Sequence, residues 1–200
     1  MDVESFTKSK AMELPRNIVI GHDALHAVGE VCQALKLGKK ALVVADERTV
    51  KIAGKTVEKE LAARKIRTSE FLIPDATWEE VREGEERIRK GSFEFAVGVG
   101  GGRSIDVAKC ASFNAGVPFV SVPTAASHDG VVSSRASIQK GNEKVSIAAQ
   151  TPIAVIMDTG VIAESPFRFL ASGCGDIISN LAAVKDWALA RNLRNEYYSS

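Results

Sequence analysis

Between Asn17 and Met157 the chain alternates short apolar runs with longer segments whose apolar residues recur at helical spacing, and this alternation limits the fold more than any other feature. The first four expected strands lie at residues 17–20, 40–45, 67–73 and 95–99, and residues 40–45 form a continuous apolar run. Continuous apolar strands separated by helices are typical of a parallel sheet covered on both faces. The sequence therefore predicts an α/β fold with a mostly parallel sheet and flanking helices.

Capping residues mark the expected helices between these strands. The segment His22–Leu35 has helical spacing, and Gly38 is placed to end it. Residues 48–64 are compatible with a second helix. Thr77 can cap a third helix over Trp78–Lys90, whose first turn is rich in glutamate, the charge favoured at a helix N-terminus.

After Pro123 the pattern changes. Two short strands at residues 134–139 and 144–148 flank Gly141–Asn142 and predict a β-hairpin. Residues 153–157 form a further apolar run of strand length.

From Pro166 the chain is expected to be helical through Arg191, with no helix stop signal just before its last residues. We therefore expect a nucleotide-binding α/β domain over residues 1–163. Residues 164–200 would begin a separate helical domain that holds metal and substrate.

Composition excludes several classes of protein. Lys and Arg total 26 and Asp and Glu total 25, so the net charge of +1 gives no general attraction to nucleic acid. The three cysteines are widely spaced, which argues against a disulfide framework and against a zinc site made of cysteines. No apolar run is long enough for membrane insertion, and Met1–Lys10 lacks the apolar core of a signal peptide. We expect a cytoplasmic protein that forms a homo-oligomer.

The strongest local signal is the run FAVGVGGGRSIDVAK over residues 95–109, in which Gly100, Gly101 and Gly102 join a strand to a helix. Consecutive glycines let the backbone approach a ligand closely, and a helix N-terminus attracts anions. The run is neither GxGxxG nor a P-loop. A plain tight turn is the alternative, but the place between strand and helix favours pyrophosphate binding, as in Rossmann-like sheets.

Two further segments follow predicted strands. The run VPTAASHDG over residues 122–130 offers small hydroxyl side chains, and His128 and Asp129 can take part in proton transfer or substrate hydrogen bonding. A polar surface loop is the alternative. Asp46 follows the strand at 40–45 and can accept hydrogen bonds from the adenosine ribose, or it can cap the next helix.

The helical part opens with SGCGDIISN, in which Asp176 follows two glycines. A carboxylate there can bind a metal or can simply complement the helix dipole. Cys174 fits a small apolar side chain better than a nucleophile. His22 and His26 have the i, i+4 spacing of a metal pair, but no other ligands surround them, so we interpret both as helix-surface residues.

Taken together, GGGRSIDVAK, VPTAASHDG, TPIAVIMDTGVI and SGCGDIISNLAAVKDWALA resemble the archaeal sn-glycerol-1-phosphate dehydrogenases. These belong to the iron-containing alcohol dehydrogenase and dehydroquinate synthase superfamily. The likeness runs from about Leu14 to the last residue. GGGxxxDxAK points only to the superfamily, whereas TAASHDG followed by GCGDIISN and DWALA favours the narrower family.

The resemblance implies reduction of dihydroxyacetone phosphate to sn-glycerol 1-phosphate with NADH or NADPH and a zinc ion, supplying the backbone of archaeal membrane phospholipids. It implies substrate contacts for Asp129 and Asp176, with Asp176 also a zinc ligand. The residues that it assigns to the cofactor are Asp46, Gly102, Arg103, Ser104, Ile105, Asp106, Thr124, Ala125, Ala126, Ser127 and Ser133. The family's other zinc ligands are histidines further along the helical domain, so we expect this chain to be a truncated, inactive fragment.

Three alternatives stay open. A glycerol or polyol dehydrogenase of the same superfamily would share the cofactor and the metal but would act on a substrate without phosphate. A nucleotide-binding module without catalysis fits the missing histidines. A lyase similar to dehydroquinate synthase would use NAD only transiently. The choice between NADH and NADPH is not decided by the sequence.

Overall fold

The computed structural model describes residues 13–196 and 198, so the opening segment Met1–Lys10 lies outside the described residues. At its centre is a six-stranded sheet in which every neighbouring pair of strands is parallel. The strand order is β1-β8-β5-β4-β2-β3. The strands are β1 (Asn17–Gly21), β2 (Lys40–Ala45), β3 (Arg67–Leu72), β4 (Phe95–Gly100), β5 (Phe119–Pro123) and β8 (Ala154–Asp158). The predicted fold class is confirmed.

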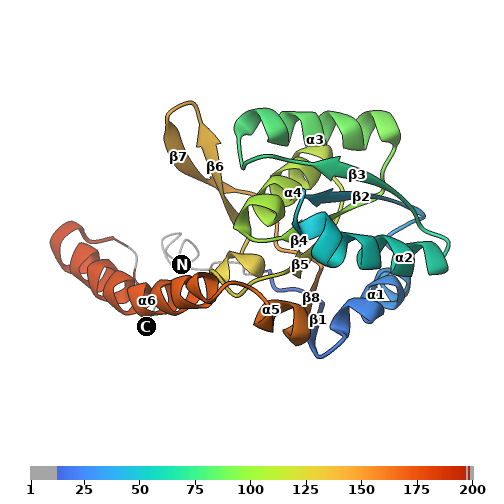
Figure 1. Cartoon of the computed structure of the whole chain (residues 1–200). Coiled ribbons are helices and arrows are strands. Elements are labelled where there is room, and N and C mark those ends of the chain that lie inside the picture. The colour runs from blue at the N-terminus through green and yellow to red at the C-terminus, as the bar shows by residue number, and fades with distance from the viewer. Residues whose placement is uncertain (1–12, 197, 199–200) are drawn as a thin grey trace, which may run out of the picture.

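Helices cover both faces of this sheet (Figure 1). On one face lie η2 (Ala24–Ala27), α1 (Val28–Ala34), the π-helical turn η3 (Val50–Gly54) and α2 (Lys55–Ala63). On the other face lie α3 (Trp78–Gly91) and α4 (Gly102–Ala115). The remaining elements are the short η4 (Asp129–Val131), the antiparallel hairpin of β6 (Arg135–Lys140) and β7 (Glu143–Ala148), α5 (Thr159–Ala163) and α6 (Phe167–Arg194).

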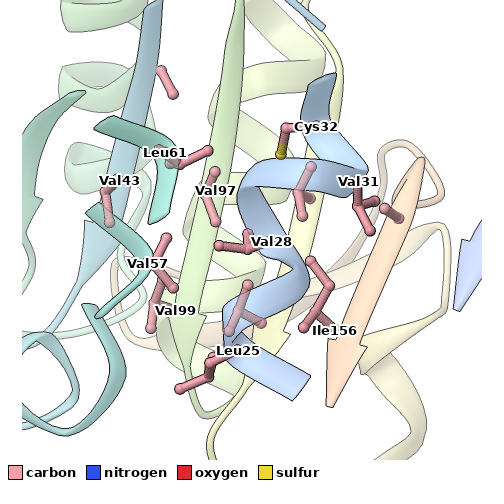
Figure 2. Close-up of a cluster of buried hydrophobic side chains, with 14 of the residues drawn as sticks. Leu25, Val28, Val31, Cys32, Val43, Val57, Leu61, Val97, Val99 and Ile156 are labelled. Carbon is pink, nitrogen blue, oxygen red and sulfur yellow. The ribbon is translucent and has the colours of Figure 1, made fainter. Parts of the chain in front are cut away.

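Two apolar cores follow from strand geometry, because successive side chains of a strand point to opposite faces. Val43 and Val97 pack with Val28 and Leu61 beneath α1 and α2, as Figure 2 shows. Leu42 and its neighbours on the other face pack against α3 and α4. Both faces of the central strands are therefore sealed, which is why their sequence is apolar throughout.

Several helix ends differ from the predictions. Gly38 does not end the first helix: Lys36 adopts the left-handed conformation, with φ of 55°. His22 precedes η2, so His22 and His26 do not share one α-helix, and both are exposed. Thr77 does cap α3, since its hydroxyl accepts a hydrogen bond from the N–H of Glu80 at 3.3 Å. The last helix has a stop signal that we missed, because Asn195 is left-handed.

Helix α6 leaves the sheet layer and extends away from it (Figure 1). None of its residues is buried, and its exposed apolar side chains include Ile177, Leu181 and Leu193. A domain border near residue 163 stays a prediction. None of the helices in the described part of the chain is long and apolar enough to cross a membrane.

Asp158, at the end of β8, is hydrogen-bonded to η2 and to the first turn of α5. One carboxylate oxygen accepts a hydrogen bond from the N–H of Leu25 at 3.2 Å, and the other accepts from the N–H of Gly160 at 2.9 Å. Burial by itself raises the pKa of Asp158, but hydrogen bonds from several backbone N–H groups outweigh it, so the pKa lies below its ordinary value of 3.8. The ionised form is therefore the one that stabilises the fold.

We expect Asp158→Asn to lower the free energy of unfolding by about 1 kcal/mol at neutral pH, as loss of a helix cap does. Because the folded pKa is lowered, the stabilisation is complete above 3.8 and disappears as the pH falls through the folded pKa. Urea unfolding of both proteins at about pH 7 and about pH 3 measures this difference. A gap between the two proteins that is unchanged at low pH would contradict the assignment.

Candidate nucleotide and substrate site

The site lies at the carboxyl ends of β2, β4 and β5. The chain leaves β2 towards β3 on one face and leaves β4 towards β5 on the other, so the connections diverge between β2 and β4. Ligands of open parallel sheets bind at such a switch point. The glycine turn after β4 and Asp46 after β2 flank it.

The glycine turn is shaped for a close approach of the backbone. Gly100 has φ of 148°, and a Cβ there would lie 2.9 Å from Oγ of Ser104 and 3.1 Å from Oγ1 of Thr49. The first hydrogen bond of α4 runs from the N–H of Ile105 to the carbonyl of Gly101. The N–H groups of Gly102, Arg103 and Ser104 precede that bond, and a helix leaves such groups for an outside acceptor.

The side chains of Arg103, Ser104 and Ile105, which follow the glycine turn, have different surroundings. Arg103 is exposed and donates to the carbonyl of Pro74 at 3.3 Å. The side chain of Ile105 is fully buried in the core. Ser104 is 1% exposed, and its Oγ is buried without a hydrogen-bond partner in the described part of the chain. Leaving such a group unpaired costs about 1–3 kcal/mol, so Ser104 is a candidate ligand contact.

The carboxylate of Asp106 interacts with other groups of the protein. Its Oδ2 accepts from the N–H of Ser137 at 2.9 Å, and its Oδ1 lies 3.5 Å from Nζ of Lys109. Lys109 is fully buried and also donates to the carbonyls of Gly130 at 2.8 Å and Arg135 at 2.7 Å. Burial lowers the pKa of Lys109, and the nearby Asp106 carboxylate offsets part of that effect. The pair fastens residues 130–137 to α4, while a contact of Asp106 with a cofactor stays a prediction.

Asp46 satisfies one of its two predicted roles directly. Its Oδ1 accepts hydrogen bonds from the N–H groups of Arg48 and Thr49, both at 2.8 Å. Thr49 in turn donates to the carbonyl of Val99 at 3.0 Å, which joins this cap to the end of β4. The cap uses one carboxylate oxygen, so the ribose contact predicted for Asp46 remains compatible with it.

The segment Thr124–Ser127 lies beside the glycine turn, since the N–H of Thr124 donates to the carbonyl of Gly100 at 3.0 Å. Thr124 and Ala125 are buried, whereas Ala126 is exposed. Further on, Oγ of Ser133 accepts from the N–H of Arg135 at 2.9 Å. Asp46, the glycine turn and Thr124 therefore lie together at one edge of the sheet, and the contacts of all the predicted cofactor residues with a cofactor stay predictions.

Asp129 and Asp176 are brought together from positions far apart in the sequence. Oδ2 of Asp176, on α6, accepts a hydrogen bond from the N–H of Asp129 at 2.8 Å. Asp129 lines a cavity of about 210 Å³ together with Gly173 and Cys174, which precede Asp176 on α6. A larger depression of about 830 Å³ along α3 is lined by charged surface residues and lies away from the glycine turn.

The side chains around Asp176 do not form a complete zinc site. Catalytic zinc takes three protein ligands. In the described residues no group of three or more His, Cys, Asp or Glu side chains is placed to hold a metal ion. Asp176 as a zinc ligand stays a prediction, and no chemical step is assigned to a metal here.

The surroundings of two residues at this edge do not follow from the sequence. His128, a candidate for proton transfer or substrate hydrogen bonding, accepts at Nδ1 from the N–H of Gly130 at 2.9 Å, and its Nε2 is buried without a partner in the described chain. Lys109 lies in the glycine motif, but the sequence gives it no role. The fold and this edge of the sheet place the chain among the Rossmann-like α/β proteins.

Comparison with known proteins places the chain more narrowly. The profile of the iron-containing alcohol dehydrogenase family matches residues 19–166, and the chain belongs to that family. It is 51% identical over 190 residues to the glycerol-1-phosphate dehydrogenase [NAD(P)+] of Methanosarcina mazei, covering 95% of this chain and 53% of that protein. For the enzyme of the same name from Thermococcus sibiricus, the identity is 47%, with 94% and 53% covered. The chain spans about half the length of the curated relatives that it matches.

Solved structures agree on the fold. Glycerol dehydrogenase from Schizosaccharomyces pombe superposes with a TM-score of 0.78 at 25% identity, covering 92% of this chain and 47% of that one. A probable glycerol dehydrogenase from Sinorhizobium meliloti gives a TM-score of 0.80 at 24% identity, with 92% and 50% covered.

Proposed function

We propose that this chain is the nucleotide-binding half of an NAD(P)H-dependent dehydrogenase that reduces dihydroxyacetone phosphate to sn-glycerol 1-phosphate. The observation that carries the proposal is an identity of 50–51%, over 95–96% of this chain, to archaeal enzymes of that name. The product would supply the backbone of archaeal membrane phospholipids. A cytoplasmic location and a homo-oligomer are part of the same proposal.

The residues present fit a dinucleotide. The unpaired N–H groups of Gly102, Arg103 and Ser104, together with the positive end of the α4 dipole, would hold the pyrophosphate. Ser104 offers a buried hydroxyl without a partner in the described chain. The second carboxylate oxygen of Asp46 would accept from the ribose. Once bound, NAD(P)H supplies the hydride.

At the other end of the site, Asp129 and Asp176 would orient the substrate. The N–H of Asp129 fixes one carboxylate oxygen of Asp176. The other oxygen, and the carboxylate of Asp129, would accept hydrogen bonds from substrate hydroxyls. Zinc bound through Asp176 would need ligands from outside the described residues.

Replacing Gly102 with Val is expected to weaken NADH binding tenfold or more, because branched methyl groups would cover the first turn of α4. The fold should persist, since the new Cβ would meet only the edge of the His128 ring, 2.7 Å from Nε2, and not backbone. Calorimetry with NADH and a far-UV spectrum measure the two effects. Equal affinity of the two proteins would remove the glycine turn from the site.

Substrate choice needs a longer protein. In a chain extended to the length of its relatives, NADH oxidation with dihydroxyacetone phosphate should far exceed that with dihydroxyacetone. A preference for dihydroxyacetone would favour the polyol dehydrogenase alternative.

A further inference from the structure

The side chain of His128 is held in one tautomer by its neighbours. A backbone N–H can only donate, so the bond from Gly130 N–H to Nδ1 at 2.9 Å requires that Nδ1 carries no proton. The proton of the neutral ring is then on Nε2. Nε2–H is therefore a hydrogen-bond donor in this arrangement.

The core of the protein fixes this arrangement. The carbonyl of Gly130 accepts from Nζ of Lys109 at 2.8 Å, and Lys109 is fully buried within α4. Lys109 thus sets the position of the Gly130 residue whose N–H binds His128. The direction of the His128 ring is set from α4 and not by solvent.

Nε2 of His128 lies against the first turn of α4. A Cβ on Gly102 would be 2.7 Å from Nε2, which is buried and has no partner in the described residues. A second polar atom in the same turn, Oγ of Ser104, is equally without a partner there, and Ser104 is 1% exposed. Two unpaired polar atoms from different segments converge on one helix N-terminus. A phosphate group carries several acceptor oxygens, and its charge suits the positive end of the helix, so it fits such a set of donors.

We propose that Nε2–H of His128 donates a hydrogen bond to a pyrophosphate oxygen of the bound nucleotide, so that His128 is a specific anion contact beyond the glycine turn. This inference rests on the proposed function. The pyrophosphate is preferred over the substrate phosphate because Nε2 lies against Gly102 of the glycine turn. The ring edge lies against Gly102 in this structure, so a bound nucleotide would require a small shift of the segment that carries His128, after which Nε2–H would gain a charge-assisted hydrogen bond.

Three variants of His128 distinguish the effect of the Nε2 proton on binding from the effect of the ring's shape. His128→Asn keeps an acceptor for the N–H of Gly130, since an Asn side chain commonly bonds two residues onward, but it is too short to reach α4. His128→Gln keeps a donor at the reach of Nε2. His128→Phe keeps the ring volume without the proton. Unfolding free energies of all three identify any loss of fold, and the Asn and Gln pair differ by one methylene.

NADH, ADP-ribose and adenosine are titrated against each protein by calorimetry. We expect the Asn and Phe variants to bind NADH and ADP-ribose about tenfold more weakly, the Gln variant to stay within about threefold, and adenosine to bind all proteins alike. Unchanged NADH affinity in the Asn and Phe variants overturns the inference but leaves the proposed function intact. A wild-type chain that does not bind NADH overturns both. Competition with glycerol 1-phosphate completes the test: if only its affinity falls in the Asn variant, the pyrophosphate assignment is wrong.

Discussion

Replacing Lys109 with Met is expected to lower the free energy of unfolding by about 3–5 kcal/mol, because it leaves one member of a buried ion pair without its partner. Lys109 is fully buried, and Asp106 is 7% exposed. Methionine fills a similar volume but donates no hydrogen bond. The Asp106 carboxylate would lose its cation, and the carbonyls of Gly130 and Arg135 would lose their donor.

Urea unfolding followed by circular dichroism measures this loss, with Lys59→Met as the matched control. Lys59 is exposed on α2, so its replacement should change stability by no more than about 0.5 kcal/mol. Adding Asp106→Asn to the Lys109 variant should restore part of the stability, because the asparagine oxygen still accepts from Ser137 without burying a charge. If the Lys109 variant lost less than about 1 kcal/mol, the pair would not be what fastens the loop to α4.

The sheet was predictable because its signal is local. The strands β2 and β4 are apolar on both faces, and each is followed by a segment of helical spacing, so the order of these elements follows from the period of the sequence. The same reasoning failed at Gly38. That glycine has φ of 121°, and a Cβ there would lie 2.5 Å from the side chain of Glu94, so it serves a contact between distant segments and not a helix cap. The π-helical turn at Val50–Gly54 likewise had no local signal.

The parts of the candidate site that are formed by the backbone at strand ends could be predicted from the sequence. The glycine turn, Thr124 and Asp46 all follow strands of one parallel sheet, so their convergence at one edge follows from topology. The roles of Lys109 and His128 were not predictable. Lys109 bonds to carbonyls 21 and 26 residues away, and the unpaired Nε2 of His128 is recognisable only once the atoms that surround it are placed. Asp106 is the opposite case. Its motif predicts a contact with the cofactor, but in the structure its carboxylate accepts a hydrogen bond from the N–H of Ser137.

Replacing Gly173 with Ala is expected to separate α6 from the loop that carries Asp129. A Cβ on Gly173 would lie 2.2 Å from the carbonyl oxygen of Ala126 and 3.1 Å from its carbon. Both atoms are backbone, so the clash cannot be relieved by rotating a side chain. Overpacking of this kind costs about 1–3 kcal/mol. The hydrogen bond from the N–H of Asp129 to Asp176 should then be lost, since it joins the same two segments.

Gly175 is the matched control, because it lies two residues away on α6 and a Cβ there would meet nothing within 4 Å. Gly175→Ala should stabilise the helix by roughly 0.5–1 kcal/mol through helix propensity alone. Hydrogen exchange of the Asp129 amide reports on the contact directly, because its N–H donates to Asp176 and no residue of α6 is buried in the core beneath the sheet. Exchange should accelerate in the Gly173 variant and not in the Gly175 variant. Equal protection in both would mean that α6 does not depend on this close approach. Asp176 would then be held beside Asp129 by their hydrogen bond alone.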